Sequence, residues 1–217
     1  LLEELSYTHR TMYRGSMSFE KKRLYALEDN AVYTSGGFFQ RIKDWFKRSN
    51  KPYQVTDFRK INKPAAEYDR VSDLRDGQDE VLACIAVCDN GIIKAPPAFG
   101  KSLIIVEVCK MYPSLRILIV SNSLGITDTL YKRLISEIPD SQVGRLGGGY
   151  KDISRITVST TKSLMYLDPT KVDLLLFDEV HQAGAASTAE ALASFKNARF
   201  FGFSASPTGR SDGADKV

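Results

Sequence analysis

Short, almost wholly apolar runs separated by helical patterns constrain the fold of this chain more than any other feature. The runs are Ile92-Ile93, 116–120 (RILIV), 156–158 (ITV), 172–177 (VDLLLF) and 199–203 (RFFGF). Helical patterns lie between most of them, at about 101–112, 125–137 and 187–196. Strands that are apolar on both faces are typical of a parallel sheet covered by helices. The sequence therefore predicts a doubly wound α/β domain, whose ligands bind beyond the carboxyl ends of the strands.

The first 64 residues differ in composition from the rest of the 217-residue chain. They carry 13 Lys and Arg against 7 Asp and Glu, whereas residues 65–217 carry 17 against 19. They also hold 11 of the 22 aromatic residues. A basic, aromatic-rich module is typical of a nucleic-acid anchor, although a small hydrophobic domain with a solvated basic face explains the composition equally well. We expect a small α+β domain over 1–64, a larger domain over 65–217, and a linker within 59–73.

Within the first domain, strand-like runs occur at 22–28 and 31–35, and another at 51–57. Ser35 is a suitable helix cap, and aromatic residues then recur at helical spacing, which predicts a helix with a mostly buried aromatic face. Basic residues elsewhere on this helix are the candidates for phosphate contact: Arg41, Lys43, Lys47 and Arg48.

The chain shows no sign of a membrane or secretory origin. No run approaches the roughly 18 apolar residues of a membrane span, and no basic-then-apolar leader follows Leu1. Three cysteines and two histidines do not suggest a zinc site or a disulfide framework. We expect a cytoplasmic protein with no membrane partner, and the missing initial Met suggests a fragment.

Residues 95–102 read APPAFGKS, which matches the phosphate-loop pattern G-x-x-x-x-G-K-[ST] except at Ala95. Gly100 lets backbone N–H groups wrap the phosphates, Lys101 neutralises them, and the Ser102 hydroxyl holds Mg²⁺. A short strand precedes the loop and a helix follows it, so the helix N-terminus points at the anion. The candidate nucleotide-binding residues of the loop are Pro97, Ala98, Phe99, Gly100, Lys101 and Ser102.

An acidic pair, Asp178-Glu179, directly follows the apolar run VDLLLF, with two predicted strands between it and the loop. Asp178 is placed to position Mg²⁺, and Glu179 to orient and deprotonate an attacking water, as in phosphate-loop hydrolases. An acidic helix N-terminus would account for the pair by itself, but its spacing from Lys101 favours the catalytic interpretation.

The order of phosphate loop, D-E-x-H (178–181) and S-A-S-P (204–207) resembles motifs I, II and III of superfamily 2 helicases and translocases. The segment LRDGQ (74–78) resembles the glutamine motif of that superfamily. The resemblance implies a RecA-like domain that binds ATP and Mg²⁺, with Gln78 bonding the adenine and Arg75 packing on it. It also implies that hydrolysis is coupled to motion through His181, Ser204, Ala205 and Ser206.

Two further segments, IVSNS (119–123) and VSTTKSL (158–164), resemble motifs Ia and Ib, which lie on the strand-tracking surface of the family. The glycines at 147–149 resemble a turn where a nucleic-acid backbone approaches closely, although a flexible loop tip would explain three consecutive glycines equally well. The nucleic-acid contacts that the resemblance implies are Ser121, Asn122, Ser123, Gly148, Ser159, Thr160 and Thr161.

The basic N-terminal module and the glycine turn look most like phage branch-migration helicases of the UvsW kind. This resemblance implies an ATP-dependent DNA helicase that acts on branched or duplex DNA in recombination, replication or repair, in the cytoplasm of a bacterial host; RNA is less favoured. The family also needs a second RecA-like domain with an arginine finger worth about 10³–10⁵ in rate. The chain ends at Val217, before such a domain, so we expect little ATP hydrolysis from this stretch alone.

Two alternatives remain open. The same motifs serve a duplex translocase that does not separate strands. In isolation, the chain could also act as a DNA-binding module with negligible ATPase activity, binding with steep salt dependence.

Overall fold

The computed structural model describes residues 1, 6–13, 16–23, 25–29, 31–34, 38–67, 74–180 and 186–205. The chain forms two compact units, Leu1–Phe58 and Arg59–Pro207. The division follows Phe58, whereas the sequence predicted a domain boundary after residue 64.

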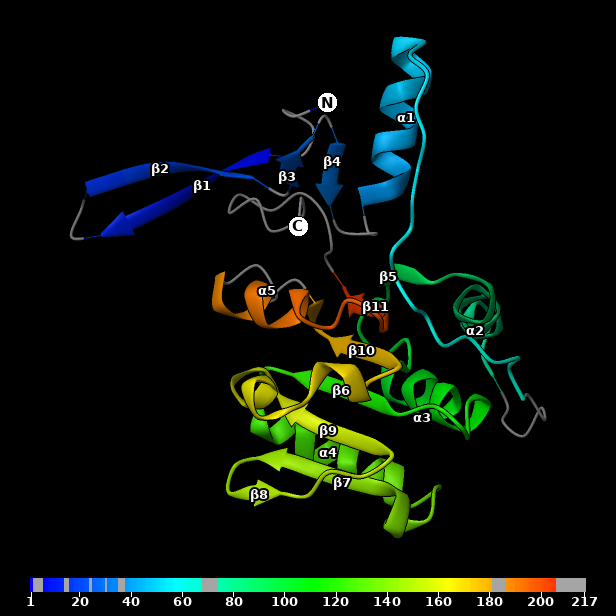
Figure 1. Ribbon diagram of the computed structural model, residues 1–217. Coiled ribbons are helices and arrows are strands. Elements are labelled where there is room, and N and C mark those ends of the chain that lie inside the picture. Colours follow the sequence, from blue (N-terminus) through cyan, green and yellow to red (C-terminus); the bar gives the residue numbers. More distant parts are fainter. Residues whose placement is uncertain are drawn as a thin grey trace. The chain divides into compact units, whose positions relative to one another are not determined.

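A seven-stranded sheet is the framework of the larger unit (Figure 1). Its strands are β5 (Asn90–Lys94), β6 (Ile117–Ser121), β7 (Val143–Gly147), β8 (Tyr150–Lys151), β9 (Ile156–Thr160), β10 (Leu174–Asp178) and β11 (Arg199–Ser204). They lie in the order β5-β11-β10-β6-β9-β7-β8, and every pairing is parallel except that of β7 with β8. The predicted α/β class with a parallel sheet is confirmed.

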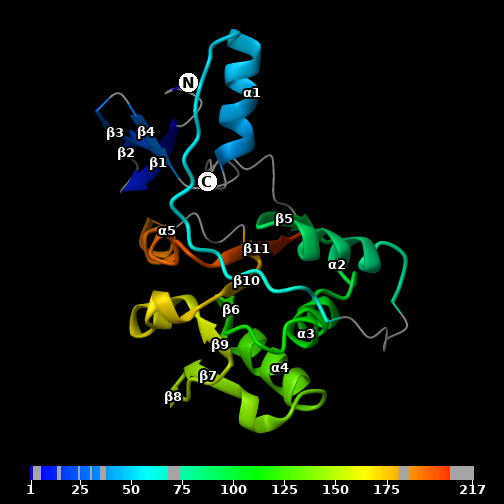
Figure 2. The same ribbon diagram turned by 45° about the vertical axis from the view of Figure 1, so that its right-hand side comes forward.

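Helices pack on both faces of this sheet (Figures 1 and 2). They are α2 (Gln78–Val87), α3 (Lys101–Met111), α4 (Leu124–Ile135) and α5 (Ala186–Ala193), with 3-10 helices η2 (Asp140–Gln142), η3 (Thr161–Tyr166) and η4 (Pro169–Lys171). Leu174 and Leu176 of β10 enter one core, with residues of α2, α3 and α4, while Leu175 and Phe177 enter a second core that includes Leu164 of η3. Since alternate side chains of a strand point to opposite faces, two cores require strands that are apolar at every position.

The topology brings the carboxyl ends of the parallel strands to one edge. Strand β5 lies at one end of the sheet, and β10 and β11 lie between it and β6. Ligands of open α/β sheets bind where the strand order reverses in this way, outside the carboxyl ends. The phosphate loop follows β5 and the acidic pair ends β10, so both lie at this edge.

The smaller unit contains two antiparallel hairpins and one helix. They are β1 (Ser6–Tyr13) with β2 (Ser16–Arg23), β3 (Tyr25–Glu28) with β4 (Ala31–Thr34), and α1 (Phe39–Ser49). The predicted strand is confirmed over Ala31–Thr34, and the predicted helix and the α+β character of this part are confirmed. The helix cap predicted at Ser35 is wrong, because the N-cap of α1 is Phe38; Ser35 itself lies outside the described residues. The expected single strand over 22–28 is wrong, because β2 ends at Arg23 and β3 begins at Tyr25.

Two other expectations for this unit are wrong, and side-chain packing explains the difference. Residues 51–57, predicted as a strand, have no regular secondary structure. Tyr53 instead stacks on Phe46 of α1, with ring centroids 4.6 Å apart, so the segment packs against the helix rather than pairing with a strand. The aromatic face of α1 is only partly buried: Phe38, just before α1, is buried, but Phe39 is 44% exposed.

The segment predicted as a linker is held on the larger unit over residues 59–67. The Lys60 N–H donates to Asn197 Oδ1 (3.0 Å), and Lys63 Nζ donates to the Val87 carbonyl (2.7 Å) and to Asp89 Oδ1 (2.8 Å). The Glu67 N–H donates to the Met111 carbonyl (2.8 Å). We call residues 59–67 the strap. Its partners precede β5 and β11 or end α2 and α3, so the strap lies along the amino edge of the sheet, opposite the phosphate loop.

No helix in the described part of the chain is long and apolar enough to cross a bilayer.

Candidate active site

The phosphate loop connects β5 to α3 and is held by backbone bonds at both ends. The Ala95 N–H donates to the Ser204 carbonyl of β11 (2.9 Å), and the Leu103 N–H donates to the Gly100 carbonyl (2.9 Å). Ala98 and Gly100 have φ of 63° and 92°. A Cβ at Gly100 would lie 2.5 Å from Gln78 Nε2, so only glycine fits both the backbone conformation and the space.

Two residues near the start of α2 hydrogen-bond to this loop: Gln78, the first residue of α2, and Arg75, just before it. The Gln78 side chain is fully buried, with Nε2 donating to the Phe99 carbonyl (2.5 Å) and Oε1 accepting from the Arg75 N–H (2.9 Å). Arg75 Nη1 donates to the Ala98 carbonyl (2.9 Å). The two residues therefore support the backbone that would surround the phosphates. Their predicted contacts with adenine stay a prediction.

Lys101 and the acidic pair come together across the sheet edge. Lys101 Nζ lies 3.6 Å from Asp178 Oδ1 and forms an ion pair with Glu179. Glu179 has φ of 57°, which turns the chain directly after β10. Gly202 of β11 allows this turn, since a Cβ there would lie 2.6 Å from the Val180 side chain. A cation and two carboxylates from distant parts of the sequence thus converge at one point.

The Asp178 carboxyl group is buried, with 7% of the residue exposed. Burial raises its pKa; the Lys101 charge opposes this shift and the Glu179 charge adds to it, and the net result is a raised pKa. Its Oδ1 atom accepts no hydrogen bond in the structure. Such an oxygen, beside a phosphate loop, is chemically suited to a hard cation.

A magnesium ion fits these residues only as part of a nucleotide complex. Among the described residues, no group of three or more His, Cys, Asp or Glu side chains could hold a metal. Mg²⁺ usually takes one or two protein oxygens and completes its shell with phosphates and water. Asp178 and the hydroxyl of Ser102, in the first turn of α3, are the residues that would hold it.

The segments that resemble motifs Ia and Ib end adjacent strands at the same edge. Ser121 of β6 pairs with Thr160 of β9, and Val120 pairs with Ser159. Ser121, Ser159 and Thr160 are buried, whereas Asn122 and Ser123 are exposed and Thr161 is half-buried. Thr160 Oγ1 lies 3.0 Å from Ser163 Oγ, so this hydroxyl bonds within the protein. The exposed groups at this edge are thus the side chains of Asn122 and Ser123 and the backbone, whereas the serines within the strands are buried.

The three glycines join β7 to β8 in a tight turn beside motif Ib. All have positive φ, 110° at Gly147, 63° at Gly148 and 93° at Gly149. A Cβ at Gly147 would lie 2.8 Å from Thr160 Oγ1, and one at Gly148 would lie 2.9 Å from Leu124 Cδ2. Gly147 and Gly148 thus serve close packing as well as turn geometry. Their predicted contact with a nucleic-acid backbone stays a prediction.

The other predicted residues lie in three places. Ser204 is buried at the end of β11, followed by the half-buried Ala205; His181 and Ser206 lie outside the described residues. In the smaller unit, Lys47 and Arg48 are exposed in the last turn of α1. Arg41 lies over the Phe38 ring, 5.2 Å from its centroid.

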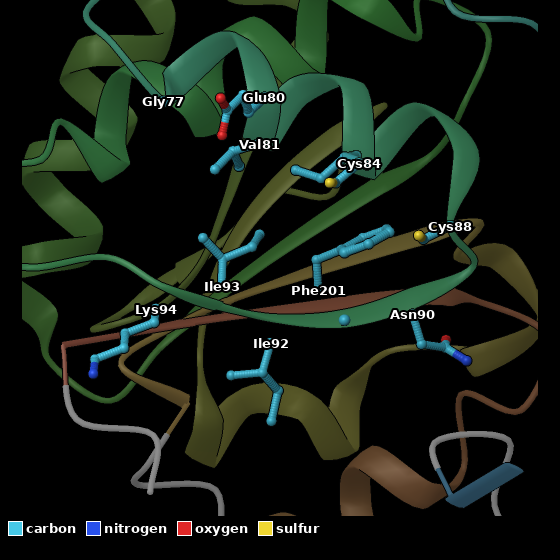
Figure 3. Close-up of a pocket in the computed structure, with 12 residues that line it drawn as sticks. Gly77, Glu80, Val81, Cys84, Cys88, Asn90, Ile92, Ile93, Lys94 and Phe201 are labelled. Carbon is cyan, nitrogen blue, oxygen red and sulfur yellow. The ribbon is translucent and has the colours of Figure 1, made fainter. Parts of the chain in front are cut away.

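Sequence reasoning missed a cavity of about 290 Å³ between α2 and the edge strand β5 (Figure 3). Ile93 and Phe201 line it, and the sulfur atoms of Cys84 and Cys88 face it from α2 and its end. Both cysteines are exposed free thiols.

Comparisons with known proteins found a matching family model and a curated relative. The model of the family described as "Type III restriction enzyme, res subunit" matches residues 49–209. A protein of Haloarcula marismortui described as "Putative DNA 3'-5' helicase Rad25" is 26% identical over 175 residues, a match that covers 76% of this chain and 28% of that protein. The chain therefore spans less than a third of the length of this curated relative.

Solved helicase structures share the fold. The UvsW helicase of bacteriophage T4 superposes with a TM-score of 0.72 at 16% identity, over 90% of this chain and 79% of that chain. The Hef helicase domain of Pyrococcus furiosus gives a TM-score of 0.56 at 19% identity, over 66% of this chain and 35% of that chain. At these identities the likeness concerns the fold, and it confirms the expected RecA-like architecture.

Proposed function

Because the chain belongs to the family described as the type III restriction enzyme res subunit, we propose that it is the first motor domain and accessory N-terminal domain of an ATP-driven DNA helicase. The recognition of a superfamily 2 helicase resembling UvsW is confirmed by the family match and the shared fold. A helicase-like function follows from the family. The DNA substrate, the residue roles and the action on branched or duplex DNA are our proposal.

The meeting of Lys101 with Asp178 and Glu179 carries this proposal. Lys101 would neutralise the β- and γ-phosphates of ATP, and backbone N–H groups up to Gly100 would surround them. The phosphates are competing anions for the Lys101 ammonium, so ATP would draw it away from Glu179. Glu179 would then accept a proton from the attacking water.

Magnesium, held by Ser102 and Asp178 together with the phosphates, would neutralise charge that develops on the phosphate oxygens. Asp178 is suited to this role because its buried Oδ1 has no other hydrogen-bond donor in the structure. His181, Ser204, Ala205 and Ser206 would couple hydrolysis to closure against a second RecA-like domain of the same protein, where an arginine finger would act.

Nucleic acid would lie across the carboxyl edge of β6, β7 and β9. The exposed Asn122 and Ser123, the turn at Gly148, and Thr161 lie there. Arg41, Lys47 and Arg48 of α1 would add phosphate contacts from the N-terminal unit. We propose a role in recombination, replication or repair, in the cytoplasm of a bacterial host if the protein is phage-encoded. A duplex translocase without strand separation is the alternative, distinguished by assays on forked and four-way DNA.

Nucleotide binding by this chain tests the site directly, since it needs no second domain. Lys101→Ala should weaken binding of Mg-ATP at least tenfold, because a charge-assisted contact to phosphate contributes about 1.5–3 kcal/mol. Isothermal titration calorimetry measures this. Lys171→Ala, which removes an exposed lysine of the same unit, should leave the affinity unchanged. Equal affinities of the wild type and Lys101→Ala would refute the site.

A further inference from the structure

Tyr150 is an exposed aromatic residue held at the carboxyl edge of the sheet. It is 52% exposed, although it begins strand β8 directly after the glycine turn. Gly148 and Gly149, between the paired residues Gly147 and Tyr150, both have positive φ, as in the two-residue turns of tight hairpins. Such a turn fixes the register of the strand that follows, so the backbone determines where the Tyr150 ring emerges.

Arg145 supports this ring from within the protein. Its guanidinium carbon lies 4.0 Å from the centroid of the Tyr150 ring and 5.8 Å from that of Tyr131 in α4. The Arg145 side chain is only 15% exposed and forms an ion pair with Asp128. A cation over an aromatic face is attracted by the ring electrons. The ring is thus braced by a mostly buried, charge-balanced arginine, although half of the residue remains in contact with solvent.

The surroundings of the ring suit a nucleotide chain. Gly148 lies against the exposed Leu124, and Gly147 against Thr160 and Ser163, so the hairpin adjoins both motif Ia and motif Ib. A Cβ at Gly149 would meet no atom within 4 Å, so its surface is open. The exposed Lys151 follows Tyr150, and the exposed Lys162 lies in η3. Lysines attract phosphates, and an exposed ring offers a face to a base.

We propose that Tyr150 stacks on a base of a single strand of nucleic acid, and that Arg145 positions its ring. This inference rests on the proposed function, because it assumes that the strand follows the carboxyl edge of β6, β7 and β9. Base stacking by Tyr150 would be a different kind of contact from the others proposed at this edge. The polar and glycine residues there can meet the sugar-phosphate backbone, whereas Tyr150 would engage a base through its π-face and tolerate any sequence.

The test compares a base-bearing oligonucleotide with an abasic strand of the same length and charge. Affinities are measured by fluorescence anisotropy for the wild type, Tyr150→Leu, Tyr150→Phe and Lys151→Ala. Tyr150→Leu should weaken binding of the base-bearing strand about tenfold and leave the abasic strand unaffected. Tyr150→Phe retains the ring and should bind as the wild type does. Lys151→Ala should weaken both strands equally, because it removes only charge.

A second measurement covers the case in which Tyr150→Leu disturbs the hairpin. A strand with 5-iodouracil should crosslink to Tyr150 of the wild-type chain on irradiation, and peptide mapping identifies the residue. The inference is overturned if the wild type binds the base-bearing strand but Tyr150→Leu weakens both strands alike or neither, and no crosslink forms at Tyr150. If the wild type binds neither strand, the proposed nucleic-acid surface fails, and this inference fails with it.

Discussion

At the scale of single residues, the buried Asp178 carboxyl group of the candidate site is expected to lower the free energy of unfolding at neutral pH. Burial raises its pKa above 3.8, despite the Lys101 ammonium nearby. A carboxyl group with a higher pKa in the folded chain binds protons more tightly there, so the free energy of unfolding falls as pH rises from the unfolded to the folded pKa. Above that interval the full cost is present. The proposed catalytic position is therefore expected to cost stability at neutral pH.

We predict that Asp178→Asn has a larger free energy of unfolding than the wild type at pH 7, because the amide has no charge to desolvate. The gain should shrink as the pH falls toward 3.8, where the wild-type carboxyl group is protonated. Urea titrations at pH 7 and pH 4 measure the two differences. The same variant should bind Mg-ATP more weakly.

Asp173 provides a control of opposite sign. Burial by itself would raise its pKa, but hydrogen bonds from Arg116 lower it below the usual value. That stabilisation is present at neutral pH and is lost as the pH falls through the lowered pKa. Asp173→Asn should therefore destabilise the protein at pH 7. A loss of stability in both variants at pH 7 would contradict the interpretation of Asp178.

At the scale of elements, a buried arginine of β11 donates hydrogen bonds to the C-terminal end of α2. Arg199 of β11 is fully buried, and its Nη2 donates to the carbonyls of Ile85 and Cys88, the latter at 2.8 Å. Its guanidinium carbon lies 5.2 Å from the Tyr112 ring centroid and 5.4 Å from that of Phe201. A cation at a helix C-terminus satisfies the last carbonyls and interacts favourably with the helix dipole.

We predict that Arg199→Met destabilises the protein by about 2 kcal/mol, because it leaves two carbonyls without their charged donor. Chemical denaturation followed by circular dichroism measures this. Arg133→Met removes an exposed arginine of α4 that pairs with Glu137 at 2.7 Å, and should cost no more than about 0.5 kcal/mol. Similar small losses in the two variants would show that Arg199 does not stabilise α2.

The elements also show which parts of the structure sequence patterns can predict. The strands β6, β10 and β11 were predictable because burial on both faces leaves long apolar runs. The hairpin β1–β2 was missed because residues such as Lys21, Lys22 and Arg23 give no apolar alternation. The strand predicted at 51–57 failed because its partner is α1, and packing against a helix leaves no local pattern.

The sequence was sufficient to predict which residue types form the candidate site, but not which of its side chains are exposed. Residue type and spacing suffice for Gly100, Lys101 and Asp178, since their chemistry requires those side chains. Which serines of motifs Ia and Ib are exposed depends on strand register: Ser121 and Ser159 lie within fully buried strands. The glycines at 147–149 indicated a turn, but the exposure of Tyr150 and its contact with Arg145 depend on packing that the sequence pattern does not show.

At the scale of the whole molecule, the strap joins separate elements of the larger unit. Asp89, just before β5, accepts a hydrogen bond from Lys63 at 2.8 Å and lies 3.8 Å from Arg59. Asn62 Nδ2 donates to Asp173 Oδ1 at 3.4 Å. Arg59, Lys63 and Asp89 are partly exposed, so each of their ion pairs contributes at most about 1 kcal/mol. The strap is held by many weak contacts.

We predict that Asp89→Ala increases the rate of tryptic cleavage within the strap, after Arg59 or Lys60, about twofold to fivefold. The reason is that loss of about 0.5–1 kcal/mol raises the population of the detached strap by that factor. Mass spectrometry of timed digests measures it. Asp168→Ala, which removes an exposed carboxylate whose hydrogen bonds go to Thr170 of η4 and not to the strap, should leave the rate unchanged. Equal cleavage in all three proteins would mean that Asp89 does not hold the strap.

The position of the strap has a mechanical consequence. The covalent connection from the N-terminal unit reaches the larger unit along the amino edge, where its bonds end on turns before β5, β10 and β11. A load on that connection would be divided among these elements rather than carried by any one of them, because each contact is weak. Since the strap contacts the edge of the sheet opposite the phosphate loop, such a load would enter the larger unit away from that loop.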